Sequence, residues 1–152
     1  METGGNKKMN ELKVKKLDPM AKLPTYGSSD AAGMDLYALK GSEIDAGETV
    51  MIHTGIAMAI PKGYVGLIYA RSGLACKNDL APANKVGVID ADYRGEIIVA
   101  LHNHGKLNRV VMNGDRIAQM VITPYVTCTP YEVEELDDTE RGDGGFGSTG
   151  QN

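Results

Sequence analysis

The chain of 152 residues contains no tryptophan, one phenylalanine and only two cysteines. With so few large aromatic side chains, its core must be built from aliphatic residues and methionine. Cys76 and Cys128 are far apart and have no metal-binding spacing, and this low cysteine content favours a reducing, cytoplasmic location. We expect both cysteines to act as small apolar fillers in the packing.

Basic residues and long apolar runs are also scarce. The 16 Lys and Arg residues are outnumbered by 20 Asp and Glu residues, and the net charge is −4. Because nonspecific affinity for nucleic acid comes mainly from Lys and Arg at phosphates, this balance argues against a nucleic acid polymer as a partner. No apolar run reaches transmembrane length and no signal-peptide apolar region is present, so we expect no membrane partner. A few basic residues placed together can still bind a small anion.

Glycine is plentiful, with 19 residues, and it separates short segments rich in valine and isoleucine. Such segments, joined by turn residues at close intervals, predict an all-β sandwich or barrel. The clearest strand covers 49–60, where alternate residues from Val50 to Ile60 fall on one face. The Asn113–Gly114 pair favours a type I′ turn and predicts a strand pair around it. Further strands are predicted at 11–17, 64–70, 110–112 and 116–123, and one short helix at 74–79.

The two ends of the chain differ in composition from the middle. Residues 1–10 are polar and glycine-rich, and we predict a flexible N-terminal arm there. Residues 11–136 carry the predicted strands and form a single all-β domain. Residues 137–152 are acidic and then glycine-rich, so they cannot bury apolar area and are predicted to form a flexible C-terminal tail.

The segment Gly87–Glu96 places two carboxylates, Asp90 and Asp92, next to a tyrosine, Tyr93, and an arginine, Arg94. β-Branched runs flank these polar residues on both sides. If the segment is a β-hairpin, its polar residues lie in a turn that two hydrogen-bonded strands hold rigidly. Side chains held in this way can be placed accurately enough to form a chemical site. An ordinary surface turn is the alternative, because Asp and Gly are common in turns.

Two further segments have the composition of an anion site. Arg71–Gly73 follows an apolar strand and combines a guanidinium group, a hydroxyl and a glycine amide. On the strand at 116–120, alternation puts Gln119 on the face opposite to Arg116 and Ala118, where its amide can donate to a phosphate. A polar strand end and a solvated strand residue are the simpler alternatives for these two features.

The segment from Arg141 to Gly150 contains the only phenylalanine of the chain, Phe146, among glycines that cannot bury it locally. Glycines let a backbone approach phosphates closely, and Ser148, Thr149 and Arg141 are natural phosphate partners. An unburied ring in such a tail favours stacking on a base. The segment lacks the P-loop pattern, and a disordered tail is the alternative.

Taken in order, these segments resemble the trimeric deoxyuridine triphosphate nucleotidohydrolase (dUTPase) family. The resemblance covers nearly the whole chain and rests on five segments: 32–36, 71–73, 87–96, 115–119 and 141–150. It implies a jelly-roll-like all-β subunit, a β-barrel or sandwich, that assembles as a homotrimer with active sites between subunits. It also implies Mg²⁺-dependent hydrolysis of dUTP by water to dUMP and pyrophosphate, which controls the dUTP level and supplies dUMP for thymidylate synthesis.

The resemblance also implies roles for single residues. Asp90 corresponds to the family's aspartate that holds the attacking water. The backbone from Gly87 reads the uracil edge, with help from the asparagine that corresponds to Asn84. Tyr93 corresponds to the tyrosine beneath the deoxyribose, which leaves no room for a 2′-hydroxyl. Asp35 corresponds to a carboxylate that reaches Mg²⁺ through water.

The remaining correspondences concern the phosphates and the tail. Residues that correspond to phosphate contacts are Arg71, Ser72, Gly73 and Gln119. Residues that correspond to the closing tail, with the phenylalanine ring over the uracil, are Arg141, Phe146, Gly147, Ser148 and Thr149. A triphosphate needs cations and amide donors, which Arg71, the tail and Mg²⁺ would supply.

Two alternatives remain on the same fold. A dCTP deaminase would carry its catalytic glutamate at Ala100, which cannot transfer a proton. A regulatory or binding protein, with or without catalytic activity, is the other alternative. One departure from the family's pattern is Ala70, which stands where the second segment usually begins with proline, and we expect no loss of activity from it.

Overall fold

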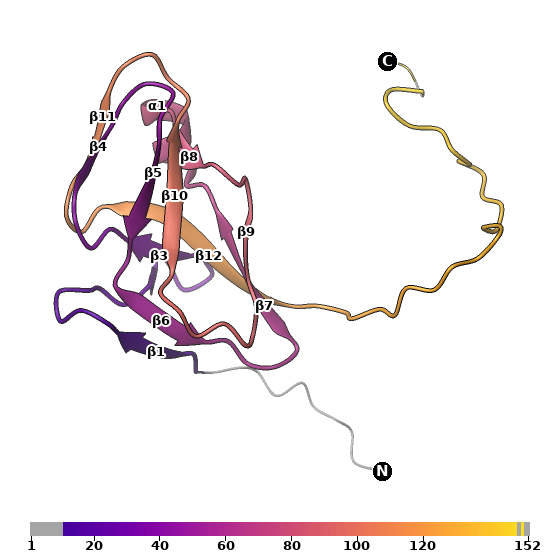
Figure 1. Ribbon diagram of the computed structural model, residues 1–152, viewed down its shortest axis with the longest axis horizontal. Helices are drawn as coiled ribbons and strands as arrows, with labels where there is room; N and C mark the ends of the chain where they lie inside the picture. Colours follow the sequence, from indigo (N-terminus) through magenta and orange to yellow (C-terminus); the bar gives the residue numbers. More distant parts are fainter. Residues whose placement is uncertain (1–10, 149, 151–152) are drawn as a thin grey trace, which may run out of the picture.

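The computed structural model describes residues 11–148 and residue 150 (Figure 1). The predicted arm, 1–10, and Thr149 lie outside the described residues. Almost all regular structure in the described part of the chain is β, which confirms the predicted class. In chain order the elements are β1 (Lys13–Lys16), β2 (Thr25–Tyr26), β3 (Met34–Tyr37), β4 (Ser42–Ile44), β5 (Thr49–His53), β6 (Ile56–Ala59), β7 (Tyr64–Tyr69), α1 (Ser72–Asn78), β8 (Leu80–Pro82), β9 (Gly87–Ile89), β10 (Ile98–Asn103), β11 (Arg109–Val111) and β12 (Arg116–Pro124).

Antiparallel sheets form the body of the molecule. The largest has the strand order β2-β3-β12-β7-β9, a second has the order β5-β10-β8, and β1-β6 and β4-β11 form two-stranded pairs. In Figure 1 the long β12 crosses behind the steeply running β5 and β10. The inner faces of these crossing sheets enclose one core, as in a sandwich or barrel.

The core is aliphatic, as the scarcity of aromatic residues predicts. Its largest fully buried apolar side chains come from all of the sheets and include no aromatic ring. They are Leu36, Ile44, Ile56, Ile60, Leu80, Ile97, Leu101, Val111, Ile117 and Met120. Burial of a Leu or Ile side chain contributes about 1.5–3 kcal/mol, so this cluster supplies much of the driving force for folding.

The predicted strand at 49–60 is two strands, because the chain bends at Thr54 and Gly55. Gly55 has a left-handed backbone with φ +70°, and a side chain there would press against Ala21 and Leu39. The bend sends β5 to pair with β10 and β6 to pair with β1. The alternate residues that were predicted to lie on one face still point into the core on both sides of the bend. The buried residues of this set are Ile52, Thr54, Ile56, Met58 and Ile60.

Two pairs of strands that were predicted to pair with each other, around Gly87–Glu96 and around Asn113–Gly114, pair with other strands instead. β9 pairs with β7 and β10 pairs with β5 and β8, so the segment Gly87–Glu96 is a crossover between two sheets and not a hairpin. Asn113 and Gly114 do form a turn, with Gly114 at φ +80°, but β11 pairs with β4 and β12 with β3 and β7. Each strand instead joins a distant strand that lets it bury its apolar face.

The helix α1, expected at 74–79, forms at Ser72–Asn78 and ends at Asp79 in a left-handed backbone with φ 57°. None of its residues is buried. Cys76 is therefore exposed, and so is Cys128, so their predicted role as packing fillers is wrong. No helix in the described residues has the length and apolar character needed to cross a membrane.

Candidate active site

An ion-pair cluster lies where β3, β12 and β7 run side by side in the largest sheet. The register places Asp35 of β3 opposite Gln119 of β12, and Gln119 opposite Tyr69 of β7. Arg71, two residues after the end of β7, reaches back so that its Nε lies 2.9 Å from Asp35 Oδ1. The Asp35 side chain is only 13% exposed, so a single carboxylate orients a guanidinium group at the edge of the core.

Arg116 joins this cluster, which the sequence alone did not predict. A β-bulge between Arg116 and Ala118 shifts the register of β12 against β3. Ile117 and Ala118 are consequently both buried, and Arg116 lies on the same face as Gln119, with Nη1 3.6 Å from Asp35 Oδ2. The predicted grouping of Arg116 with Ala118 is therefore wrong, because a bulge reverses the alternation on one side of it. Two guanidinium groups around one carboxylate leave a net positive charge, as an anion site requires.

Gln119 is held in place by neighbours on both sides. Its Nε2 donates a hydrogen bond of 2.9 Å to the carbonyl oxygen of Ala70. A Cβ added to Gly33 would overlap Gln119 Oε1, so the lack of a side chain at Gly33 leaves room for the carboxamide in this position. One N–H of Gln119 remains for a ligand. The contact to residue 70 uses its carbonyl group, which proline also has, so Ala70 preserves it.

Arg71, Ser72 and Gly73 lie together at the start of α1. Arg71 is the N-cap residue, and its Nη1 also donates to the carbonyl oxygen of Arg116 at 3.3 Å. Ser72 and Gly73 are exposed, and a Cβ at Gly73 would meet no atom within 4 Å. The hydroxyl and the glycine therefore border open space beside the cationic cluster.

Asn84 and Gly87 lie next to each other where the crossover segment begins. Gly87 is buried on β9 and pairs with Ile68 of β7, and a Cβ there would come within 3.4 Å of Asn84 Nδ2. The Asn84 side chain thus lies against the Gly87 backbone. An exposed amide beside a strand backbone offers several donors and acceptors together, which suits the edge of a pyrimidine.

The crossover places Asp90 and Tyr93 on a tightly braced loop. The Tyr93 N–H donates to Asp90 O at 3.1 Å, and Arg94 Nη1 donates to Ala91 O and Tyr93 O at 2.6 and 2.9 Å. Asp90 is exposed and lines a surface hollow of about 540 Å³. The other residues of this hollow are Ile60, Lys62, Ala91, Asp92, Arg94 and Tyr125.

The C-terminal segment contacts mainly itself. In Figure 1 it leaves the body after β12 and swings away from it. Arg141 Nε donates to Gly144 O at 2.8 Å, and the Ser148 N–H donates to Gly145 O at 3.0 Å. Phe146 is fully exposed. The predicted site residues therefore form three groups in this chain, around Asp35, around Asp90 and in the tail, and no hydrogen bond between described residues joins one group to another.

Comparisons with known proteins show which family the chain resembles. A family model described as dUTPase matches residues 20–150. Relatives named deoxyuridine 5′-triphosphate nucleotidohydrolase include that of Syntrophotalea carbinolica, 50% identical over 141 residues that cover 91% of this chain and 96% of the relative. The protein of that name from Rickettsia bellii is 52% identical over 145 residues, which cover 93% of this chain and 97% of the relative.

Solved structures are similar as well. A mutant of the Staphylococcus bacteriophage 80alpha dUTPase with dUpNHpp matches with a TM-score of 0.87 and 31% identity, covering 93% of this chain and 99% of that one. A mutant dUTPase of phage phi11, described with a structural Mg(II) ion, matches with a TM-score of 0.77 and 29% identity over 84% of this chain and 99% of that one. These likenesses place the chain among all-β nucleotide hydrolases. It belongs to the dUTPase family.

Proposed function

We propose that this chain hydrolyses dUTP to dUMP and pyrophosphate, and so limits the dUTP level and supplies dUMP for thymidylate synthesis. The observation that carries the proposal is the convergence of Asp35, Arg71, Arg116 and Gln119, which come from three separate parts of the sequence, into one cationic cluster. A cluster of this kind can bind a polyphosphate, and family membership identifies the nucleotide.

In this mechanism the cationic cluster and α1 bind the phosphates. Arg71 supplies a guanidinium group that Asp35 holds in a fixed orientation. Ser72 and Gly73 supply a hydroxyl and a backbone amide, and Gln119 supplies its remaining N–H. Donors held in place before the reaction stabilise the charge that moves onto the leaving pyrophosphate without a further cost of reorganisation.

Asp90, Tyr93, Asn84 and Gly87 bind the nucleoside and the water. Asp90 accepts a hydrogen bond from a water molecule and takes its proton while the water oxygen bonds to the α-phosphorus and the bond to pyrophosphate breaks. Tyr93 lies against the sugar and excludes a 2′-hydroxyl. Asn84 and the backbone at Gly87 bind the uracil edge, and a base without the matching groups would leave these polar atoms unpaired.

The active site is completed by assembly of a homotrimer. The three groups of residues are separate in one chain, and the exposed tail leaves its own body (Figure 1). In the trimer, one subunit supplies the Asp35 cluster, a second supplies Asp90 and Tyr93, and a tail brings Arg141, Phe146, Gly147, Ser148 and Thr149. Phe146 then stacks on the base and the tail excludes water from the reacting phosphates.

Magnesium is proposed to enter with the triphosphate. The described residues contain no cluster of three or more His, Cys, Asp or Glu side chains that could hold the ion by themselves. Asp35 already accepts from Arg71 and faces Arg116, yet a carboxylate has lone pairs for a further donor such as a metal-bound water. The ion would supply charge neutralisation at the phosphates, and Asp35 would contact it only through water.

Pyrophosphate release from dUTP, dCTP, dTTP and UTP, each with Mg²⁺, tests the proposal. Turnover restricted to dUTP supports it, and equal turnover of UTP would contradict the role of Tyr93. Release of ammonia from dCTP would instead identify a deaminase, although Ala100 has no group for proton transfer. Binding of dUTP without turnover would identify a regulatory protein. A cytoplasmic location suits the two exposed free cysteines and is part of the proposal.

A further inference from the structure

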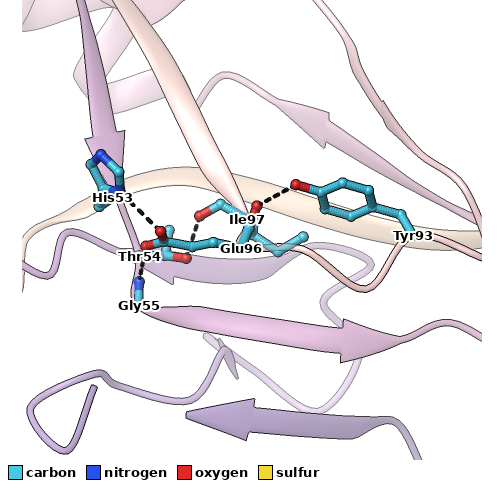
Figure 2. A network of polar contacts seen from close by, with 6 residues as sticks. All are labelled: His53, Thr54, Gly55, Tyr93, Glu96 and Ile97. Atoms are coloured by element: carbon cyan, nitrogen blue, oxygen red, sulfur yellow. Dashed lines mark hydrogen bonds and ion pairs between the residues drawn. The ribbon is translucent and has the colours of Figure 1, made fainter. Parts of the chain in front are cut away.

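Glu96 connects the end of the crossover loop to the bend between β5 and β6 (Figure 2). Its Oε1 accepts a hydrogen bond of 2.8 Å from the N–H of Gly55, and its Oε2 lies 2.9 Å from His53 Nδ1. The Glu96 side chain is 23% exposed, whereas that of His53 is 56% exposed. The carboxylate therefore uses both oxygens on one bend of the chain, at the boundary of the core.

That bend is a rigid support. Gly55 is in a left-handed conformation and packs against Ala21 and Leu39, so its N–H direction is fixed by the core. Beside it, the Thr54 hydroxyl donates to Ile97 O at 2.5 Å and the Ile97 N–H donates to Ile56 O at 2.8 Å. Ile97, the residue after Glu96, is thus fixed by hydrogen bonds at both its N–H and its carbonyl group. The contacts of the Glu96 side chain fix the next residue toward the loop as well.

Tyr93 in turn is located by Glu96 and Gly95. The Tyr93 hydroxyl donates to the main-chain carbonyl oxygen of Glu96 at 2.8 Å (Figure 2). A Cβ at Gly95 would lie 2.5 Å from the Tyr93 hydroxyl oxygen and 2.7 Å from Cζ, so the ring packs directly on that glycine. The position of the ring therefore depends on where the backbone of Gly95 and Glu96 lies, and the Glu96 carboxylate is what ties that backbone to Gly55.

We propose that Glu96 is a positioning residue for substrate selection: by tying the loop to His53 and Gly55 it sets the place of the Tyr93 ring and with it the discrimination between deoxyribose and ribose. This inference rests on the proposed function, which assigns the sugar to Tyr93. Steric exclusion of a hydroxyl tolerates little movement, since a shift of about 1 Å in a site can change rates by about a hundredfold. Glu96 itself touches no substrate in this arrangement.

The test compares the ratio of kcat/KM for dUTP to kcat/KM for UTP among variants of the full chain. Glu96→Ala removes both hydrogen bonds, and we expect the ratio to fall about tenfold or more through improved use of UTP and impaired use of dUTP. Glu96→Gln should restore the ratio to within about threefold. Its amide can accept from Gly55 and donate to His53 Nδ1 when the imidazole proton is on Nε2.

A matched control lies on the same pair of strands. His102 Nδ1 bonds to Thr49 Oγ1 at 2.9 Å near the opposite end of the β5–β10 ladder, so His102→Ala removes a comparable contact far from the loop. We expect this variant to keep the ratio of the parent protein. A Glu96→Ala protein that melts at a lower temperature but keeps the parent ratio would overturn the inference, because Glu96 would then be structural only.

Two further variants keep the test decisive if Glu96→Ala does not fold. His53→Ala removes only one of the two contacts and should lower the ratio by a smaller factor. Gly95→Ala displaces the ring directly while leaving the carboxylate in place, and it should also lower the ratio. An unchanged ratio in both variants refutes the positioning role. If the parent protein itself does not distinguish dUTP from UTP, the proposed function has failed, and this outcome is separate from a failure of the role of Glu96.

Discussion

Asp35 and Arg71 form a 2.9 Å ion pair that ties β3 to the start of α1. Asp35 is one of the least exposed charged side chains of the site, and it also faces Arg116 at 3.6 Å. The pair orients the guanidinium group of Arg71 in the absence of a ligand. A guanidinium group that is already oriented loses less side-chain entropy on binding than a free one.

Replacement of Asp35 by asparagine should weaken substrate use without unfolding the protein. The amide keeps the shape of the carboxylate but leaves the two guanidinium groups uncompensated. A hydrogen bond to a charged group contributes about 1.5–3 kcal/mol, so kcat/KM for dUTP should fall roughly ten- to a hundredfold. Asp30→Asn is the control, because Asp30 is exposed and forms no ion pair among the described residues. Equal effects of the two changes would argue against the orienting role of Asp35.

Asp90→Asn should nearly abolish turnover while leaving nucleotide binding intact. Asparagine cannot accept the proton of the attacking water, and general base catalysis contributes about 10²–10⁴ in rate. The measurements are kcat by pyrophosphate release and Kd for a non-hydrolysable dUTP analogue by calorimetry. Asp92→Asn provides the comparison, since Asp92 lines the same hollow and is given no proton-transfer role. Turnover close to that of the parent protein in Asp90→Asn would exclude Asp90 as the base.

Gly33→Ala should lower activity more than stability. The new Cβ overlaps the far end of the Gln119 side chain, which can swing away at little cost but then loses its hydrogen bond to Ala70 and its position at the phosphates. We expect a drop in kcat/KM of about tenfold, the equivalent of one such hydrogen bond. Gly27→Ala is a matched control, because a Cβ there meets nothing within 4 Å. A Gly33→Ala protein with parent activity would show that Gln119 has no part in phosphate binding.

Removal of residues 141–152 should reduce turnover strongly and leave the melting temperature of the body unchanged. The described part of the tail bonds mainly to itself, so the core does not depend on it. Phe146→Ala should reproduce part of the effect, because stacking of a base on an aromatic ring contributes about 1–3 kcal/mol. Steady-state kinetics and thermal unfolding measured on the same samples distinguish the two effects. Full activity of the shortened chain would rule out a closing tail.

Local features of the fold were predictable from the sequence, whereas strand partners were not. The inward face of 49–60 was predicted correctly, because alternation of side chains is a property of each strand alone. The bend at Gly55, the bulge after Arg116 and the crossover at Gly87–Glu96 were missed. Each of these depends on which distant strand offers a matching apolar face, and no local pattern encodes that choice.

In the candidate site too, some features could be predicted from the sequence and others required the tertiary structure. Asp90, Tyr93, Arg71 and Gln119 could be chosen as candidate site residues from the sequence alone. The chemistry of a side chain and the order of the five segments that resemble the family can both be read without a structure. Arg116 joins the cationic cluster around Asp35 only because of the bulge, and Glu96 contacts both Tyr93 and Gly55 only because of the bend at Gly55.

The sequence by itself determined an all-β class and an aliphatic core, and it supplied the candidates for the reactive groups. Only the tertiary structure decided that the informative segment at Gly87–Glu96 is a crossover between two sheets. The two strands of a hairpin pair with each other, whereas here β9 pairs with β7 and β10 pairs with β5 and β8. Glu96 in addition bonds to Gly55, about 40 residues earlier in the chain. The physical reason is that all strands together bury their apolar side chains in one core, so each strand takes its place in the sheet that lets it do so. The position of a loop is then set by the two sheets that its ends enter.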